Sequence, residues 1–151
     1  MKIKKKNIYL VRLGPKNHNW QNLKNNFSLD NYVIELSKLK QNEVSELYNS
    51  VDCLLFPSWY EGFGFPPLEA MANGLPVVAS NVASIPEVVG EAGLLYNPSD
   101  VDGMVKGITS IMNDKKIKIE MINKGIKQSS FFTWEKSVKK LVNIYNDVLN
   151  Y

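Results

Sequence analysis

One segment of the sequence, residues 53–80, constrains the fold of this chain more than any other. It opens on the apolar run 53–56, which has the length and composition of a buried strand. After a glycine-containing loop comes Pro66-Pro67, which suits the first positions of a helix because proline has a preset φ and no N–H to lose there. Gly74 is the expected left-handed cap that ends this helix, and the apolar run 77–80 follows. The segment therefore predicts a strand, a glycine loop, a short helix and a second strand.

Similar apolar runs recur along the chain and alternate with helical patterns, which is the sequence signature of a parallel α/β sheet. Five runs are expected as strands: 8–11, 32–36, 53–56, 77–80 and 93–96. We therefore expect an α/β fold, a Rossmann-like parallel sheet with helices on both faces. The length of 151 residues fits a single domain that spans 1–151.

Three further helices are expected from their apolar stripes. The first covers about 43–49, with Asn42 as its N-cap. The second carries a stripe that we expect to find in the core: Val101, Val105, Ile108, Ile111 and Met112. The last runs from the capping residue Thr133 to Leu149 and has one apolar face: Val138, Leu141, Val142, Tyr145 and Leu149.

The composition argues against several classes of protein. The net charge of +3 is too small to indicate a nucleic-acid-binding protein, and no stripe of arginines supports one. The single cysteine, Cys53, is expected to be a small buried side chain. Folding then needs no disulfide, and a reducing, cytoplasmic setting is the default expectation. No run of about 18 apolar residues occurs, so we expect no membrane-spanning helix.

Four basic residues lie close together near the amino terminus: Lys2, Lys4, Lys5 and Lys6. We expect them to be a solvated end of the chain. The alternative is a weak peripheral contact with anionic lipids at the inner membrane surface, to which each lysine contributes about 1 kcal/mol. The only histidine, His18, is expected in an exposed loop without a catalytic role.

Two carboxylates, Glu61 and Glu69, bracket the glycine loop. Glu61 follows a strand at the rim where open α/β sheets bind ligands, and it can accept hydrogen bonds from sugar hydroxyls. Glu69 is expected in the first turn of the helix, where it can accept both hydroxyls of a ribose. The N–H groups of residues 62–64 lie near the same helix N-terminus, where the peptide dipoles favour a diphosphate. The arrangement predicts a binding site for a nucleotide diphosphate sugar.

A structural alternative exists for each of these residues taken alone. The two glutamates can be ordinary acids that flank a helix, and Gly62 and Gly64 can simply form a turn. The ordered set favours the binding site, in which the two glycines let the backbone approach the phosphates without a Cβ. Trp59 and Tyr60 stand just before the loop, where we expect them either to flank a sugar or base or to pack.

This ordered set resembles the donor-binding, carboxy-terminal domain of GT-B retaining glycosyltransferases of the group 1, or family 4, type. The likeness covers the chain from about Asn31 to its C-terminus and is carried by these segments: Pro57-Ser58, 61–72, 74–80, 85–93, Asn97-Pro98 with Asp100, and 132–135. The resemblance implies transfer of a hexosyl group from a nucleotide sugar with retained anomeric configuration. It implies no metal and no further cofactor, and the sequence has no cluster of histidine and cysteine ligands.

In that family the first glutamate contacts the donor sugar, the second holds the ribose, and amides of the glycine loop bind the diphosphate. The resemblance therefore implies that Glu61 is the catalytic residue and sugar contact, and that Glu69 is the ribose ligand. The remaining donor-binding positions that it implies are Gly62, Phe63, Gly64, Phe65 and Leu68.

The chain also departs from the family pattern. Relatives open this domain with an extra strand, a Gly-Arg turn and a Lys-Gly pair, none of which precedes Ile8, and they carry an acceptor domain. We therefore expect a partner chain or domain to supply the acceptor site, and we expect the last helix to cross to it. Without these parts the chain is expected to hold a donor weakly and to transfer no sugar. Two alternatives stay open: a non-catalytic remnant or scaffolding subunit, and a sugar epimerase of similar architecture.

Overall fold

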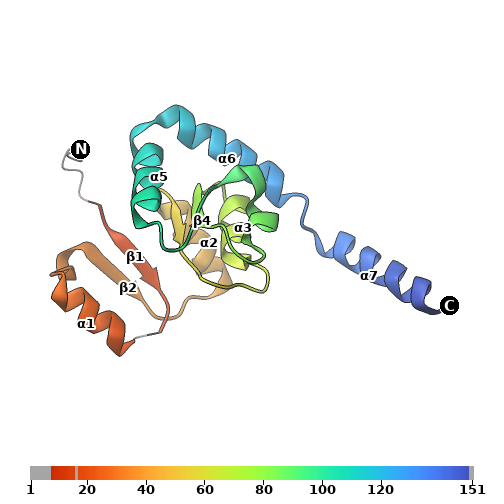
Figure 1. Ribbon diagram of the computed structural model, residues 1–151, viewed down its shortest axis with the longest axis horizontal. Coiled ribbons are helices and arrows are strands. Elements are labelled where there is room, and N and C mark those ends of the chain that lie inside the picture. The colour runs from red at the N-terminus through yellow and green to blue at the C-terminus, as the bar shows by residue number, and fades with distance from the viewer. Residues whose placement is uncertain (1–7, 16, 150–151) are drawn as a thin grey trace. The chain divides into compact units, whose positions relative to one another are not determined.

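The structure is a computed structural model that describes residues 8–15 and 17–149 (Figure 1). The lysines near the amino terminus, on which the expectation of a lipid contact depends, lie outside these residues. The chain divides into two compact units, which we call unit 1 (Met1–Val44) and unit 2 (Ser45–Tyr151).

Unit 1 contains a parallel pair of strands, β1 (Leu10–Leu13) and β2 (Val33–Leu36). They pair with Leu10 opposite Val33 and Leu13 opposite Leu36. The expected strands at 8–11 and 32–36 are therefore confirmed, although β1 begins two residues later. The connection between the strands contains helix α1 (His18–Asn26) and the short 3₁₀ helix η1 (Asp30–Tyr32).

Helix α1 was not among the expected helices. It begins because the Asn17 side chain accepts hydrogen bonds from the backbone N–H groups of Asn19 and Trp20, which have no partner within the first turn. His18 is therefore the first residue of a helix, and the expectation that it lies in a loop is wrong. Its side chain is exposed, as expected.

Unit 2 contains a three-stranded parallel sheet in the order β3-β4-β5. The strands are β3 (Leu54–Phe56), β4 (Val77–Ser80) and β5 (Leu94–Tyr96), which confirms the three expected strands. All four residues of the central strand β4 are buried, as is typical of a parallel strand covered on both faces. Strand β4 is therefore paired with a neighbouring strand on each edge and covered by other residues on both faces.

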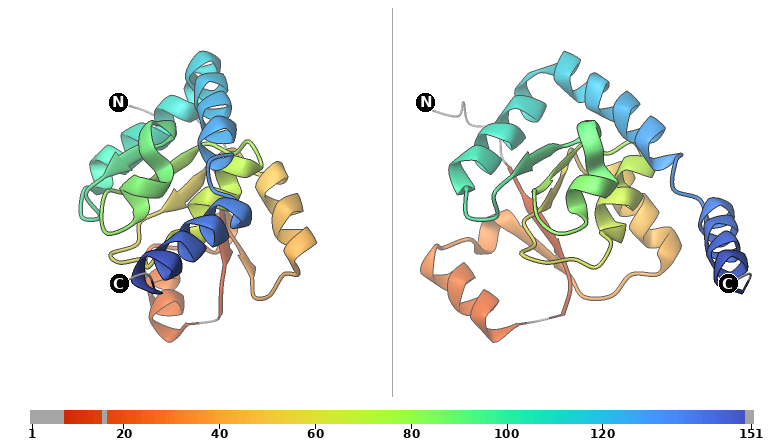
Figure 2. Two further views of the ribbon diagram at one scale, coloured as in Figure 1. Left: turned by 90° about the vertical axis from the view of Figure 1, so that its right-hand side faces the viewer. Right: turned by 45° about the vertical axis from the view of Figure 1, so that its right-hand side comes forward.

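Helices cover both faces of this sheet, as expected for the fold class (Figures 1 and 2). Alternate residues of a strand point to opposite faces. Val77 and Ala79 pack in one cluster with buried residues of α3 (Phe65–Ala72) and α4 (Ile85–Val89). Val78 packs in a second cluster with residues of α5 (Val101–Asn113) and α6 (Lys115–Ser129): Met104, Ile111 and Met121.

Helix α2 (Gln41–Ser50) precedes β3 and begins earlier than expected. Asn42 is its second residue, so the expectation that Asn42 is the N-cap is wrong. The carboxylate of Glu43 instead accepts a hydrogen bond from the backbone N–H of Lys40 at 2.6 Å, which is the return half of a capping box.

Helix α5 confirms only part of the expected buried stripe, because Ile111 is buried and Ile108 packs against the same cluster. Val101 and Val105 are 66% and 46% exposed, so the expectation that these two residues lie in the core is wrong. The reason is the glycine edge of the helix, because a Cβ on Gly107 would lie 2.9 Å from the hydroxyl of Tyr96 in β5. The close approach at Gly107 places Met104 on the buried face together with Ile111.

The remaining helices complete unit 2. Helix α6 was not expected, and the short 3₁₀ helix η2 (Gly90–Ala92) joins α4 to β5. Helix α7 (Trp134–Leu149) confirms the expected last helix, and the Thr133 hydroxyl accepts a hydrogen bond from the Lys136 N–H at 3.3 Å as its cap. No residue of α7 is buried. Among the helices that the structure describes, none combines the length and the apolarity needed to cross a membrane.

Candidate functional site

The loop between β3 and α3 has the conformation that the sequence predicts. Gly64 is the N-cap of α3 and has a φ of +102°, which a residue with a Cβ rarely adopts. Pro66 follows inside the first turn, where its missing N–H removes no hydrogen bond. At the far end, Gly74 has a φ of +70° and is the expected left-handed cap.

The backbone N–H groups of this loop are available to a ligand. Within the described part of the chain, the N–H groups of Gly62, Phe63 and Gly64 have no hydrogen-bond acceptor. The two prolines that follow carry no N–H, so the loop amides are the donors left at this end of the helix. A Cβ built on Gly62 would meet no protein atom within 4 Å. This opening therefore gives an anion direct access to the loop backbone.

Glu61 is held by two serines that come from different loops. Its carboxylate accepts a hydrogen bond from the Ser58 hydroxyl at 2.8 Å, and its backbone carbonyl accepts one from the Ser84 hydroxyl at 2.9 Å. Ser58 precedes it in the loop after β3, and Ser84 lies in the turn after β4. Because both strands are parallel neighbours, their carboxyl ends meet at one edge of the sheet.

The turn after β4 also holds a residue in an unfavourable conformation. Ala83 has a φ of +50°, in the left-handed region that a residue with a Cβ rarely adopts. It directly precedes Ser84, whose hydroxyl donates to Glu61. Strained backbone of this kind persists where the surrounding contacts fix it, and it is often found beside functional sites.

The aromatic residues of the loop have different environments. Phe63 packs on the buried cluster beneath α3, with its ring centroid 4.8 Å from that of Phe65 and 5.9 Å from that of Phe132. Phe65 is 52% exposed, whereas Leu68 is partly buried against the same cluster. The side chains of Phe63 and Leu68 therefore anchor the loop, and the ring of Phe65 packs beside Phe63 but stays half exposed.

Glu69 lies in the second turn of α3, not in the first, because the helix begins at Phe65. Its carboxylate accepts a hydrogen bond from the Tyr48 hydroxyl of α2 at 3.3 Å. Burial, and to a smaller extent the charge of Glu69, raise the pKa of Tyr48 to about 12. Tyr48 is therefore a neutral donor that orients Glu69. Sequence reasoning assigned Tyr48 to the apolar stripe of its helix and so missed this contact.

The two glutamates are thus held by separate groups, Glu61 by serines of the strand loops and Glu69 by a tyrosine of α2.

A surface cavity of about 310 Å³ lies elsewhere in unit 2. None of the predicted site residues lines it. Its lining consists of Glu91, Ala92, Lys124, Lys127, Gln128 and Phe131.

No cluster of three or more side chains suited to a metal ion occurs among the described residues. The sequence does contain one Asp-x-Asp spacing, at Asp100 and Asp102, which the expectation of a metal-free site left out of account. In the structure Asp100 is the N-cap of α5, and its carboxylate accepts a hydrogen bond from the Gly103 N–H at 2.9 Å.

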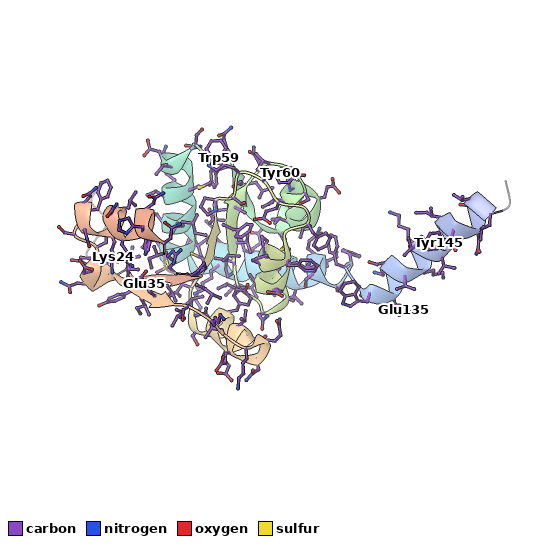
Figure 3. All side chains as sticks on the ribbon, turned by 90° about the horizontal axis from the view of Figure 1, so that it is seen from below. Lys24, Glu35, Trp59, Tyr60, Glu135 and Tyr145 are labelled. Carbon is purple, nitrogen blue, oxygen red and sulfur yellow. The ribbon has the colours of Figure 1, made fainter. Side chains whose placement is uncertain are left out.

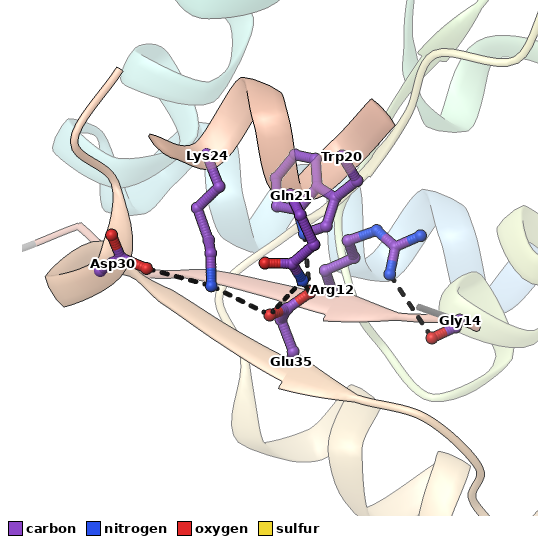
Figure 4. Close-up of polar contacts among 7 residues, drawn as sticks. All are labelled: Arg12, Gly14, Trp20, Gln21, Lys24, Asp30 and Glu35. Atoms are coloured by element: carbon purple, nitrogen blue, oxygen red, sulfur yellow. Dashed lines mark hydrogen bonds and ion pairs between the residues drawn. The ribbon is translucent and has the colours of Figure 1, made fainter. Parts of the chain in front are cut away.

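A polar cluster centred on Glu35 of β2 lies in unit 1 (Figure 4). The Glu35 carboxylate accepts hydrogen bonds from the Trp20 indole at 2.7 Å, from Gln21 at 3.2 Å and from Lys24 at 3.2 Å. Lys24 also pairs with Asp30 at 3.1 Å. The hydrogen bonds from Gln21 and Lys24 lower the pKa of Glu35. All the donors come from α1, so the cluster fastens this helix to β2.

Comparison with known protein families gives one match over nearly the whole chain. The family described as "Glycosyl transferases group 1" matches residues 1–147. Among curated proteins, O-antigen chain mannosyltransferase B of Escherichia coli is 38% identical over 116 residues, which cover 77% of this chain and 30% of that protein. The chain thus spans about a third of the length of such a relative.

Solved structures show the same fold at lower identity. Sucrose-phosphate synthase from Thermosynechococcus elongatus superposes with a TM-score of 0.82 at 24% identity, over 93% of this chain and 38% of that one. Anabaena Alr3699/HepE, in complex with UDP-glucose, superposes with a TM-score of 0.82 at 19% identity, over 92% of this chain and 41% of that one. These likenesses confirm the expected α/β fold of the GT-B glycosyltransferases.

Proposed function

The chain belongs to the group 1 glycosyl transferases, and we propose that unit 2 binds the diphosphate and sugar of a nucleotide sugar donor. The observation that carries this proposal is the set of loop amides at residues 62–64 that have no acceptor among the described residues. They lie at the N-terminus of α3, where the helix dipole adds a favourable potential for a diphosphate. HepE, with a similar fold, is a protein whose structure contains UDP-glucose, which supports a donor of this class.

The two glutamates have different roles in the proposed site. Glu61 accepts hydrogen bonds from hydroxyls of the transferred sugar, because it stands beside the loop amides and its backbone is fixed by Ser84. Glu69 accepts the ribose hydroxyls, in the orientation that Tyr48 gives it. A carboxylate can accept from two adjacent hydroxyls at once, which suits both the ribose and a hexose.

We also propose that the reaction is transfer of a hexosyl group with retained configuration and without a metal, as the family resemblance implies. Charge on the departing diphosphate must be stabilised, and removal of a single preorganised donor in such sites slows the reaction by about 10²–10³. The chain spans 30% of its mannosyltransferase relative, so we propose that a partner chain or domain supplies the acceptor site. On this proposal the chain alone binds a donor but does not turn it over.

Calorimetric titration of the purified chain tests the proposal. The ligands are UDP, GDP, UDP-glucose and GDP-mannose, and the variants are Glu61→Gln and Glu69→Ala. Glu135→Ala is the matched control, because Glu135 is an exposed glutamate of α7 outside the loop (Figure 3). Loss of hydrogen bonds to a charged group commonly costs about 1.5–3 kcal/mol, so Glu69→Ala should weaken nucleotide binding by about tenfold to a hundredfold.

The two site variants should also behave differently from each other. Glu61→Gln should remove the extra affinity that the sugar gives a nucleotide sugar, and should leave the affinity for UDP or GDP unchanged. Tyr48→Phe should weaken nucleotide binding several-fold, since Glu69 keeps its charge but loses its orienting donor. If the folded wild-type chain binds none of the four ligands at millimolar concentration, the proposed donor site is wrong. If it glycosylates an acceptor by itself, the proposed need for a partner is wrong.

A further inference from the structure

We propose that Trp59 and Tyr60 form a stacking surface for a pyranose ring beside the donor loop. The proposal rests on the function proposed above and adds a second kind of contact to it. The two side chains are 71% and 79% exposed, so they do not pack in the core. Of the two expectations from the sequence, packing or a role at a ligand, this exposure contradicts the first. Figure 3 shows both residues together at one edge of unit 2.

Both aromatic residues stand on a backbone that is fixed on each side. Ser58 lies with its hydroxyl 3.1 Å from the Tyr60 carbonyl and 2.8 Å from the Glu61 carboxylate, so this one hydroxyl braces the turn. On the other side the Ser84 hydroxyl holds the Glu61 carbonyl. These hydrogen bonds restrain the backbone that carries the two rings, which lowers the backbone entropy that a ligand must overcome on binding.

The polar atoms of the two rings have no hydrogen-bond partner among the residues that the structure describes. Neither the Trp59 indole N–H nor the Tyr60 hydroxyl is hydrogen-bonded to any residue that the structure describes. Large exposed aromatic side chains that lie together commonly mark a binding surface. The next residue, Glu61, adds a carboxylate that is an acceptor for hydroxyl groups.

This combination suits a pyranose ring better than it suits a charged or purely apolar ligand. A pyranose has an apolar face of C–H groups, which can lie on an aromatic ring, and a rim of hydroxyls, which can donate to a carboxylate. The turn from Ser58 to Glu61 contains no basic residue that would select an anion. The pyranose can belong to the donor or to an acceptor saccharide, and the chemistry of the contact is the same for both.

The test compares ligands with and without a pyranose. Titrations use UDP and GDP, their conjugates UDP-glucose and GDP-mannose, and a mannose trisaccharide without a nucleotide, with binding of the trisaccharide followed by saturation-transfer NMR. The variants are Trp59→Ala and Tyr60→Ala, with Tyr60→Phe to restore the ring alone. Trp134→Ala is the matched control, because Trp134 is an 80% exposed tryptophan at the start of α7.

We expect each alanine variant to weaken binding of the pyranose ligand by about tenfold, as is typical when a stacking ring is removed. Tyr60→Phe should restore most of the loss, and Trp134→Ala should change nothing. If the alanine variants bind UDP-glucose or GDP-mannose more weakly but bind UDP or GDP as the wild type does, the surface contacts the donor sugar. If they bind the trisaccharide more weakly, the surface contacts an acceptor.

Other outcomes overturn the proposal. If both alanine variants bind UDP or GDP more weakly to the same degree as the conjugates, the rings serve the base or the diphosphate and not a pyranose. If all pyranose ligands bind to these variants as to the wild type, the surface serves something else. Failure of the donor site itself is seen separately, because UDP and GDP then fail to bind the wild-type chain.

Discussion

In unit 1 no described residue is buried, whereas thirteen apolar side chains of unit 2 are. Helix α1 is fastened to β2 by hydrogen bonds to one carboxylate, Glu35. In unit 2, by contrast, α3, α4 and α5 pack on the sheet through apolar side chains. The glycine loop and both glutamates lie in unit 2. The proposed site is therefore supported by the part of the chain with an apolar core, which is the kind of scaffold that holds binding groups in place.

The largest expected effect comes from a cavity in the core of unit 2. Ile85→Ala should lower the free energy of unfolding by about 2–5 kcal/mol, because the side chain is fully buried between α4 and the sheet. The matched change in unit 1 is Ile34→Ala on β2, where the side chain is 49% exposed, and it should cost under about 1 kcal/mol. Urea unfolding followed by circular dichroism measures both. Equal costs at the two positions would show that the two units do not differ as described.

The next effect concerns the carboxylate that fastens α1. Glu35→Gln keeps the shape of the side chain but removes its charge, so the hydrogen bonds from Trp20 and Lys24 become weaker. We expect amide hydrogens of α1 to exchange several-fold faster, while those of α3 exchange at the wild-type rate. Glu46→Gln is the control, because Glu46 is an exposed glutamate of α2. Unchanged exchange in α1 would mean that other contacts hold this helix.

The same contrast separates what the sequence could predict from what it could not. All five strands and the loop before α3 follow from local signals: apolar runs, Pro66-Pro67 and a glycine at each end of the helix. Helix α1 contains only two apolar residues, Trp20 and Leu23, so it has no apolar stripe to identify it. Its stabilising contact, to Glu35, joins residues 11 to 15 positions apart.

The site shows the same limit. The residues 61–69 are adjacent in sequence, so the motif alone identifies them. Ser84 and Tyr48 reach the two glutamates from 23 and 21 residues away, through the pairing of β3 with β4 and the packing of α2. The expectation that Val101 and Val105 of α5 are buried was wrong for a similar reason. The buried face depends on the close approach of Gly107 to Tyr96, and a stripe of large apolar residues does not reveal such a contact.

Acid should loosen unit 1 before unit 2, but by less than the substitution of Glu35. The folded pKa of Glu35 lies below its ordinary value of 4.5, so its hydrogen bonds stabilise α1 above that pH. This stabilisation is lost as the pH falls through the lowered folded pKa. The indole N–H resonance of Trp20, which donates to Glu35, should therefore shift in this range. The indole resonances of Trp59 and Trp134 are internal controls, and a Trp20 signal that does not move below pH 4.5 would contradict the assignment.

The smallest effect is expected from an ion pair of unit 2, where polar contacts add to a core that is already apolar. Lys118 of α6 pairs with Asp52 at 2.6 Å, and the two side chains are 33% and 59% exposed. Lys118→Gln should lower the free energy of unfolding by less than about 1 kcal/mol, and about 0.5 M NaCl should remove most of the difference by screening. Urea unfolding at low and high salt measures this. A loss as large as that of Ile85→Ala would mean that unit 2 also depends on polar contacts, and the contrast between the two units would then lie in their burial but not in their stability.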